Sequence, residues 1–202
     1  MNLRATAAVI GLAVLTAACS SPTDGTATPP ASATASSSQA LPYGGAPKVE
    51  NPLPDNVFSG DPCQGLTPQQ ITKQLGSALP GKPSNEAVPS CDWTNPDTNA
   101  SIGLSYYPAS NDGLSNTYVN VKPQMKRWDV LPPIQGFPAV AYATQASQTP
   151  NTCDVVVGVT DRLAFLVDVA PRMERLGKVD SCAGAADVAN DVVTTLKQKA
   201  GR

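Results

Sequence analysis

Alternating apolar and polar positions predict a hairpin near the middle of the chain. In residues 90–93 and 101–106, large apolar side chains recur at every second position, which is the period of a strand with one buried face. The intervening residues 95–99 are rich in turn-forming types. Two strands joined through this turn are therefore expected.

Three further apolar runs lie in the C-terminal half, at residues 138–143, 153–159 and 163–169. Their β-branched and aromatic content predicts three strands, and a tight turn joins the last two. Residues 111–128 are left unassigned, because a turn signal opens them and Pro123 interrupts any long helix.

Two segments carry helix signals. Thr67 can cap a short helix that starts at Pro68 and stops at Gly76. Asp180 or Ser181 can cap a second, C-terminal helix with one apolar stripe. The stripe consists of Ala185, Ala189, Val192, Val193 and Leu196. Such a stripe packs on a sheet face, so we expect an α+β fold: an antiparallel sheet packed by the C-terminal helix and the short N-terminal helix.

Residues 1–18 have the pattern of an export signal. One cation, Arg4, precedes an apolar run at residues 7–15, and small residues stand directly before Cys19. The apolar run is about half the ~20 residues needed to span a bilayer, which argues against a membrane-spanning helix.

Residues 15–19 resemble the lipobox of bacterial lipoproteins, with Thr16 where that motif most often has Leu. The resemblance implies that Cys19 is diacylated and becomes the mature N-terminus. The protein would then be held at the outer face of the cell membrane, with the lipid bilayer as its partner through the acyl chains. An ordinary signal peptide cleaved elsewhere is the alternative.

The segment after Cys19 has the composition of a disordered tether. Of the 21 residues at positions 20–40, 18 are Ser, Thr, Pro or Ala, so the segment has too few large apolar groups to fold. The predicted organisation is a lipoprotein signal peptide at 1–18, the lipidated Cys19 and a Ser/Thr/Pro/Ala-rich tether at 19–56, and an extracytoplasmic α+β domain at 57–202.

Composition narrows the range of functions. The formal net charge is −2, which provides no general field for nucleic acid. The chain contains no His, which excludes Ser-His-Asp and Cys-His catalysis and His-assisted zinc hydrolysis. No cofactor is expected.

Four cysteines remain in the folded part: Cys63, Cys91, Cys153 and Cys182. An even number in an exported chain predicts two disulfides, for which three connectivities are possible. Neighbour pairing, Cys63 with Cys91 and Cys153 with Cys182, closes the two shorter loops and is favoured. A structural zinc site is disfavoured because C-x-x-C pairs are absent, and no metal is expected.

Several short motifs together resemble a known family. They are Asp61-Pro62-Cys63, Leu66-Thr67-Pro68, Cys91-Asp92-Trp93, Gly136-Phe137-Pro138-Ala139-Val140-Ala141, and the pair Cys153 and Cys182. Over residues 55–196 the chain resembles actinobacterial lipoproteins that share an uncharacterised domain, DUF3558. The resemblance implies an envelope protein with no catalytic residues to carry over. Some members are thought to restrain envelope-stress signalling. A weaker similarity is to the extracellular sensor domains of actinobacterial membrane kinases.

Three groups of side chains are candidates for chemistry. Trp128 with Lys126 and Arg127 forms a cationic, aromatic segment that would contact headgroups or a wall polymer, unless it is an ordinary solvated loop. Three more cations are Arg172, Arg175 and Lys178, whose charge is nearly balanced by the nearby Glu174 and Asp180. The carboxylates Asp154, Asp161 and Asp168 lie on neighbouring predicted strands or their turn, where solvent-facing placement is the ordinary explanation.

Three hypotheses follow. The first and favoured one is a non-catalytic interaction module that modulates envelope signalling or assembly through a protein partner, with an exposed patch and no deep pocket. The second is a carrier or sensor of a small amphiphile bound between sheet and helix. The third, less favoured, is a hydrolase that uses paired carboxylates with perturbed pKa values.

Overall fold

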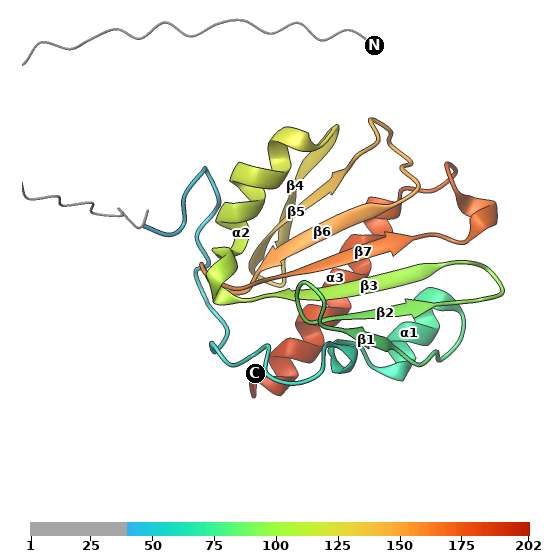
Figure 1. The fold of residues 1–202 in the computed structure, drawn as a ribbon, viewed down its shortest axis with the longest axis horizontal. Coiled ribbons are helices and arrows are strands. Elements are labelled where there is room, and N and C mark those ends of the chain that lie inside the picture. Colours follow the sequence, from blue (N-terminus) through green and yellow to red (C-terminus); the bar gives the residue numbers. More distant parts are fainter. Residues whose placement is uncertain (1–39) are drawn as a thin grey trace, which may run out of the picture. The chain divides into compact units, whose positions relative to one another are not determined.

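A seven-stranded antiparallel sheet forms the centre of the molecule (Figure 1). The computed structural model describes residues 40–202, so the signal peptide, Cys19 and most of the predicted tether lie outside the described residues. The strand order is β1-β2-β3-β7-β6-β5-β4. The strands are β1 (Lys82–Ser84), β2 (Ser90–Thr94), β3 (Ser101–Tyr107), β4 (Arg127–Ile134), β5 (Phe137–Ala143), β6 (Cys153–Gly158) and β7 (Ala164–Ala170).

The predicted hairpin is β2–β3, and the three predicted C-terminal strands are β5, β6 and β7. The turn between β6 and β7 is held by the Thr160 hydroxyl, which accepts hydrogen bonds from the backbone amides of Arg162 and Leu163 at 3.0 and 2.8 Å. Strand and turn signals in the sequence therefore located most of the sheet.

Both predicted helices are present with their predicted caps. The helix α1 (Pro68–Leu75) begins with a capping box between Thr67 and Gln70 and ends at Gly76, which has a φ of 85°. The helix α3 (Ser181–Lys199) is capped by Asp180, whose carboxylate accepts from the Cys182 amide at 3.0 Å. The expected α+β fold is confirmed.

The unassigned region 111–128 is mostly helical. It contains α2 (Gly113–Asn116), the π-helical turn η3 (Thr117–Val121) and the 3-10 turn η4 (Lys122–Gln124), and its last two residues begin β4. Further 3-10 turns are η1 (Pro62–Gly65), η2 (Ala109–Asn111) and η5 (Met173–Arg175).

The two faces of the sheet are covered differently. On one side, the α3 face, the buried residues of α1 and α3 pack against β2, β3, β5, β6 and β7 in the larger core cluster. On the other, the α2 face, Leu114 and Tyr118 pack on Val140, Tyr142 and Val156 in a smaller cluster. Figure 1 shows α3 crossing behind the strands and α2 lying near β4 and β5. In the middle of the α2 face, β3 carries Ser101, Ser105 and Tyr107, and β7 carries Asp168 between Leu166 and Ala170.

Two disulfides connect the neighbouring cysteines as predicted. Cys63 bonds Cys91 and Cys153 bonds Cys182, with Cα atoms 5.1 and 4.9 Å apart. The first ties η1 to β2, and Trp93 lies beside it, buried in the core. The second ties β6 to the first turn of α3. Each disulfide closes a loop of about 30 residues, and the chain-entropy model predicts that each stabilises the folded state by on the order of 3 kcal/mol.

Folded packing begins before residue 57, where the sequence had placed the end of the tether. Val49 and Leu53 are buried in the larger cluster, and Ala46 is buried in the smaller one. The Leu53 amide donates to the Val159 carbonyl at 2.9 Å. These apolar side chains lie among Pro, Gly and polar residues, a composition that hides their contribution to the core.

No helix within residues 40–202 is both long enough and apolar enough to cross a membrane.

Candidate functional site

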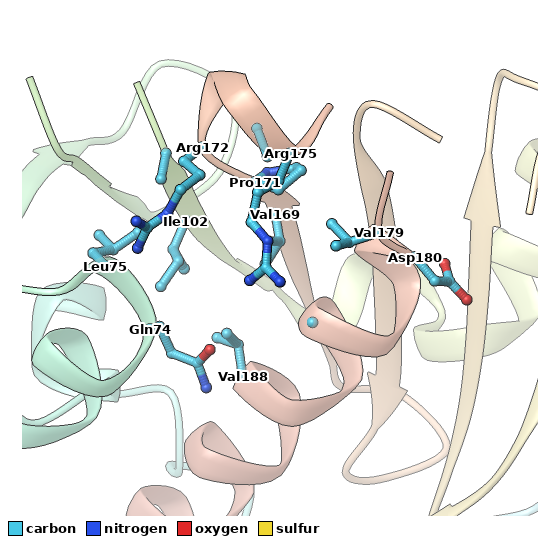
Figure 2. A pocket seen from close by; sticks show the side chains of 13 residues that line it. Gln74, Leu75, Ile102, Val169, Pro171, Arg172, Arg175, Val179, Asp180 and Val188 are labelled. Carbon is cyan, nitrogen blue, oxygen red and sulfur yellow. The ribbon is translucent and has the colours of Figure 1, made fainter. Parts of the chain in front are cut away.

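A pocket of about 240 Å³ opens between the sheet and the helices (Figure 2). Its walls come from the C-terminal end of α1, the first residues of β3, the last residues of β7 and the first turns of α3. It lies at the end of the β3–β7 pair where Ser101 faces Ala170. This is the region between sheet and helix where an amphiphile site was one of the expectations.

The floor of the pocket is apolar. Leu75 from α1, Ile102 from β3 and Val188 from α3 are all buried core residues. Val169 from β7 and Gly184 from α3 complete this surface. A Cβ atom built on Gly184 would lie 3.7 Å from Cγ1 of Val169. Gly184 thereby leaves space that a larger residue on α3 would fill.

Two arginines line the mouth of the pocket. Arg172 and Arg175 belong to residues 171–179, the connection from β7 to α3, which we call the rim segment. Figure 2 shows both side chains extending over the space between Leu75 and Val188. Within the described residues neither guanidinium forms a hydrogen bond or an ion pair. The mouth therefore presents two free cations above an apolar floor.

One of the two acids between β7 and α3, Asp180, does not neutralise these arginines. Asp180 binds the Arg127 guanidinium through both carboxylate oxygens, at 2.8 and 3.0 Å, and also caps α3. These contacts lower the pKa of Asp180, and the hydrogen bond from Arg127 has the largest effect. In Figure 2 its carboxylate is directed away from the pocket. The charge balance expected from the sequence is thus not realised at the mouth, where only Glu174 remains as a neighbouring acid.

The predicted cationic, aromatic segment is divided between the two faces of the sheet. Arg127 is engaged with Asp180 and with Asp129, at 2.7 Å. Trp128 lies in the smaller cluster on the α2 face, while Lys126 is exposed. Because Arg127 joins three structural elements through its hydrogen bonds, it has a structural role and is not free to bind a ligand.

Trp128 is held between two tyrosines. Its ring is stacked on Tyr142 at 5.9 Å and meets Tyr118 edge-on at 5.2 Å. Lys122 lies 5.4 Å from the centres of both the Trp128 and Tyr118 rings. The indole nitrogen is buried and has no hydrogen-bond partner in the described part of the chain. The packing explains the tryptophan as part of the cluster that fixes η3 and η4 to the sheet.

The carboxylates follow one row of paired residues on the α2 face. From one edge of the sheet to the other, the row is Lys82, Asp92, Gly103, Asp168, Asp154, Tyr142 and Trp128. A Cβ atom on Gly103 would lie 1.8 Å from an oxygen of Asp168 and 3.1 Å from one of Asp92. Gly103 therefore makes room for two acids that lie over it.

Asp154 and Asp168 are directly paired and half-buried. Burial, followed by the charge of Asp168, raises the pKa of Asp154 to about 6. Burial and the charge of Asp92 raise the pKa of Asp168, against a backbone hydrogen bond that lowers it. The pair lies on the α2 face and is partly exposed, so the solvent-facing placement expected from alternation holds only in part. Asp161 is separate, because its carboxylate accepts from the Val49 amide at 2.8 Å.

The rim arginines were noted in the sequence, and the carrier hypothesis expected a cavity between sheet and helix, but the residues that line the pocket were not identified. Its floor is built by residues from four elements, and only the folded topology brings these together. The available signal was a cluster of three cations directly after a strand and directly before a helix cap.

The fold and the pocket define a disulfide-linked α+β domain with a small pocket between sheet and helix. The sequence profile of the family described as "Protein of unknown function (DUF3558)" matches residues 14–195. The chain therefore belongs to the DUF3558 family. No curated protein matches the chain significantly, and no solved structure does so either.

Proposed function

We propose that this protein is a non-catalytic lipoprotein of the cell envelope whose folded domain binds a small anionic amphiphile. The observation that carries the proposal is the pocket, with an apolar floor and two arginines at its mouth that lack partners within residues 40–202. Such a site favours a carrier or sensor over a partner-binding module, for which no deep pocket was expected.

The chemistry of the pocket limits the ligand. Apolar walls contribute binding energy in proportion to the apolar area they remove from water, so an acyl chain or a ring fits the floor. Arg172 and Arg175 match a carboxylate or phosphate head, because guanidinium groups donate paired hydrogen bonds to such anions. A volume of about 240 Å³ is below the ~300–1,000 Å³ usual for drug-sized ligands. We therefore expect a short chain or a single ring inside, with the head at the mouth.

Calorimetric titration with decanoate tests this proposal. We expect decanoate to bind, and decyltrimethylammonium, which has the same chain and the opposite charge, to bind at least tenfold more weakly. Arg172→Gln and Arg175→Gln should each weaken decanoate binding by about tenfold, since hydrogen bonds to charged groups are worth roughly 1.5–3 kcal/mol. Equal affinity for the two amphiphiles would contradict the proposal.

A matched pair of helix variants tests whether the pocket is the site. Gly184→Leu places a side chain toward Val169 and into the pocket, and we expect it to abolish decanoate binding. Ala183→Leu adds the same side chain at the adjacent, exposed position of α3 and should leave binding unchanged. Both variants place Leu, a residue with good helix propensity, in α3, and circular dichroism would verify that each is folded.

The location of the protein in the envelope is tested at Cys19. Support for lipid anchoring is the apolar run followed by Ala17, Ala18 and Cys19. We expect Cys19→Ala to abolish incorporation of labelled palmitate, and to move the protein from the membrane fraction to the soluble fraction when the membranes are washed at high salt, which weakens electrostatic contacts. Continued labelling of this variant would contradict lipidation at this residue.

A further inference from the structure

The rim segment has an unusual surface for a net-acidic protein. Among the described residues only four large hydrophobic side chains are exposed, and two of them, Met173 and Leu176, lie on this segment. Their exposed fractions are 59% and 38%. The segment also carries Arg172, Arg175 and Lys178, against the single acid Glu174. It is therefore a cationic, apolar surface on a chain whose formal net charge is −2.

Hydrogen bonds to the rest of the domain hold the rim segment in place. The Met173 amide donates to the Thr98 carbonyl at 3.0 Å, and the Thr149 hydroxyl donates to the Gly177 carbonyl at 3.0 Å. The turn η5 and the positive φ of Gly177, 68°, set its path. Two exposed hydrophobic side chains are thus presented on a backbone that is hydrogen-bonded to the rest of the domain.

Apolar side chains surrounded by cations fit the surface of an anionic bilayer. The apolar groups enter the boundary between headgroups and acyl chains, and each nearby Lys or Arg adds attraction to acidic headgroups. The rim segment also borders the pocket mouth, since Arg172 and Arg175 line both. A bilayer in contact with the segment would lie beside the opening of the pocket.

We propose that the rim segment docks on an anionic phospholipid surface, so that the pocket receives its amphiphile from the bilayer. The docking rests on the exposed residues of the segment, while the transfer of ligand rests on the proposed function. This contact is separate from anchoring at Cys19. The N-terminal segment packs at the opposite end of the β3–β7 pair, where Val49 bonds Asp161 in the turn before β7.

Sedimentation with vesicles tests the docking. The full chain with Cys19→Ala is used throughout, so acyl anchoring cannot contribute and any affinity of the N-terminal residues is common to all variants. We expect binding to phosphatidylcholine vesicles that contain phosphatidylglycerol, little binding to pure phosphatidylcholine, and weakening at high salt. Arg172→Gln and Lys178→Gln should each reduce the affinity about fivefold. Met173→Ser with Leu176→Ser should reduce it at least about tenfold.

Two control variants test whether the loss of binding depends on the rim segment itself. Val130→Ser removes another exposed hydrophobic side chain, 63% exposed on β4, and Lys82→Gln removes a cation from β1. Both should leave vesicle binding unchanged. Equal losses in the control and rim variants, or equal binding to both kinds of vesicle, would overturn the docking proposal.

The outcomes separate docking from ligand binding. Gly184→Leu should abolish decanoate binding and keep vesicle binding. Met173→Ser with Leu176→Ser should keep decanoate binding and reduce vesicle binding. If the parent chain sediments with anionic vesicles but never binds decanoate, the docking stands and the proposed function fails. If it binds decanoate but not vesicles, the docking fails alone.

Discussion

Asp154 and Asp168 are the residues whose charges are least well accommodated in the fold. They are paired across β6 and β7, with Asp92 two strands from Asp168 in the same row. Neither forms an ion pair within residues 40–202. Both pKa values are raised, that of Asp154 to about 6, so the folded protein retains protons that the unfolded chain releases near pH 4. These two groups therefore make the fold more stable as the pH falls from above 6 toward 4.

Replacing Asp154 by Asn should raise the free energy of unfolding at about pH 7.5 by roughly 1–2 kcal/mol, because an ionised group in a half-buried acidic row becomes neutral. The variant should also lose most of the stabilisation that the parent gains on moving from about pH 7.5 to about pH 5. Urea denaturation at both pH values measures this.

Asp97→Asn is the matched control, since this acid is exposed in the β2–β3 turn. It should change neither the stability nor its pH dependence. An unchanged pH dependence in Asp154→Asn would show that the carboxylate is well solvated in the folded state.

The sequence indicated that these acids lie on neighbouring strands, but not that they are paired. Pairing depends on the register of β6 against β7 and on Gly103 in β3, over which Asp168 lies. A shift of one residue would have moved the carboxylates to opposite faces. Register is a property of the assembled sheet, and alternation within one strand does not determine it.

At the scale of elements, Arg127 connects three segments that are distant in sequence. From the first position of β4 it binds Asp180 at the start of α3 and the Gln148 carbonyl, at 3.2 Å, in the β5–β6 connection. The Cys153–Cys182 disulfide joins the same two regions covalently. The N-terminus of α3, which forms one wall of the pocket, is fixed by both.

Arg127→Gln should lower the free energy of unfolding by roughly 2–4 kcal/mol, because its side chain is only 12% exposed and its removal leaves Asp180 without its partner. The pKa of Asp180 should rise toward its usual value, which carboxyl-carbon NMR can follow. Lys73→Gln removes an ion pair with Asp191 whose lysine is 60% exposed, and it should cost less than about 1 kcal/mol. Similar losses for the two variants would contradict a structural role for Arg127.

Elements with local signals were predicted and elements without them were not. The helix α1 has a cap, an N1 proline and a terminal glycine within ten residues, and sequence analysis located both of its ends. The strand β4 contains Pro132 and Pro133 and begins at the last of three closely spaced cations, so it lacks the appearance of a strand. Prolines are tolerated there because β4 is an edge strand and its register with β5 shifts after Leu131.

At the scale of the whole molecule, the N-terminal approach is part of the folded domain. Within residues 40–56, Tyr43 is hydrogen-bonded to Ser115 of α2, Val49 and Leu53 are bonded to the β6–β7 turn, and the segment contributes to both core clusters. Composition suggested a tether as far as residue 56, because Pro and polar residues dominate the segment. Three well-spaced apolar residues are enough to attach it, provided that the sheet offers them a surface, and the sequence alone does not reveal such a surface.

This attachment predicts a large effect for a single side chain outside the expected domain. Leu53 is buried, and its amide is bonded to Val159. Leu53→Ala should therefore lower the free energy of unfolding by about 2–4 kcal/mol, through lost apolar burial and the cavity that remains. Leu41→Ala, at a half-buried position near the start of the described residues, should cost less than about 1 kcal/mol.

Denaturant unfolding measures both changes, and limited proteolysis gives an independent readout. The parent should resist cleavage between residues 40 and 56, while Leu53→Ala should become sensitive there, because the segment detaches more easily than the disulfide-linked sheet unfolds. If Leu53→Ala has parental stability and the parent is cut readily in this segment, residues 40–56 behave as a tether after all, and the folded domain begins near residue 57.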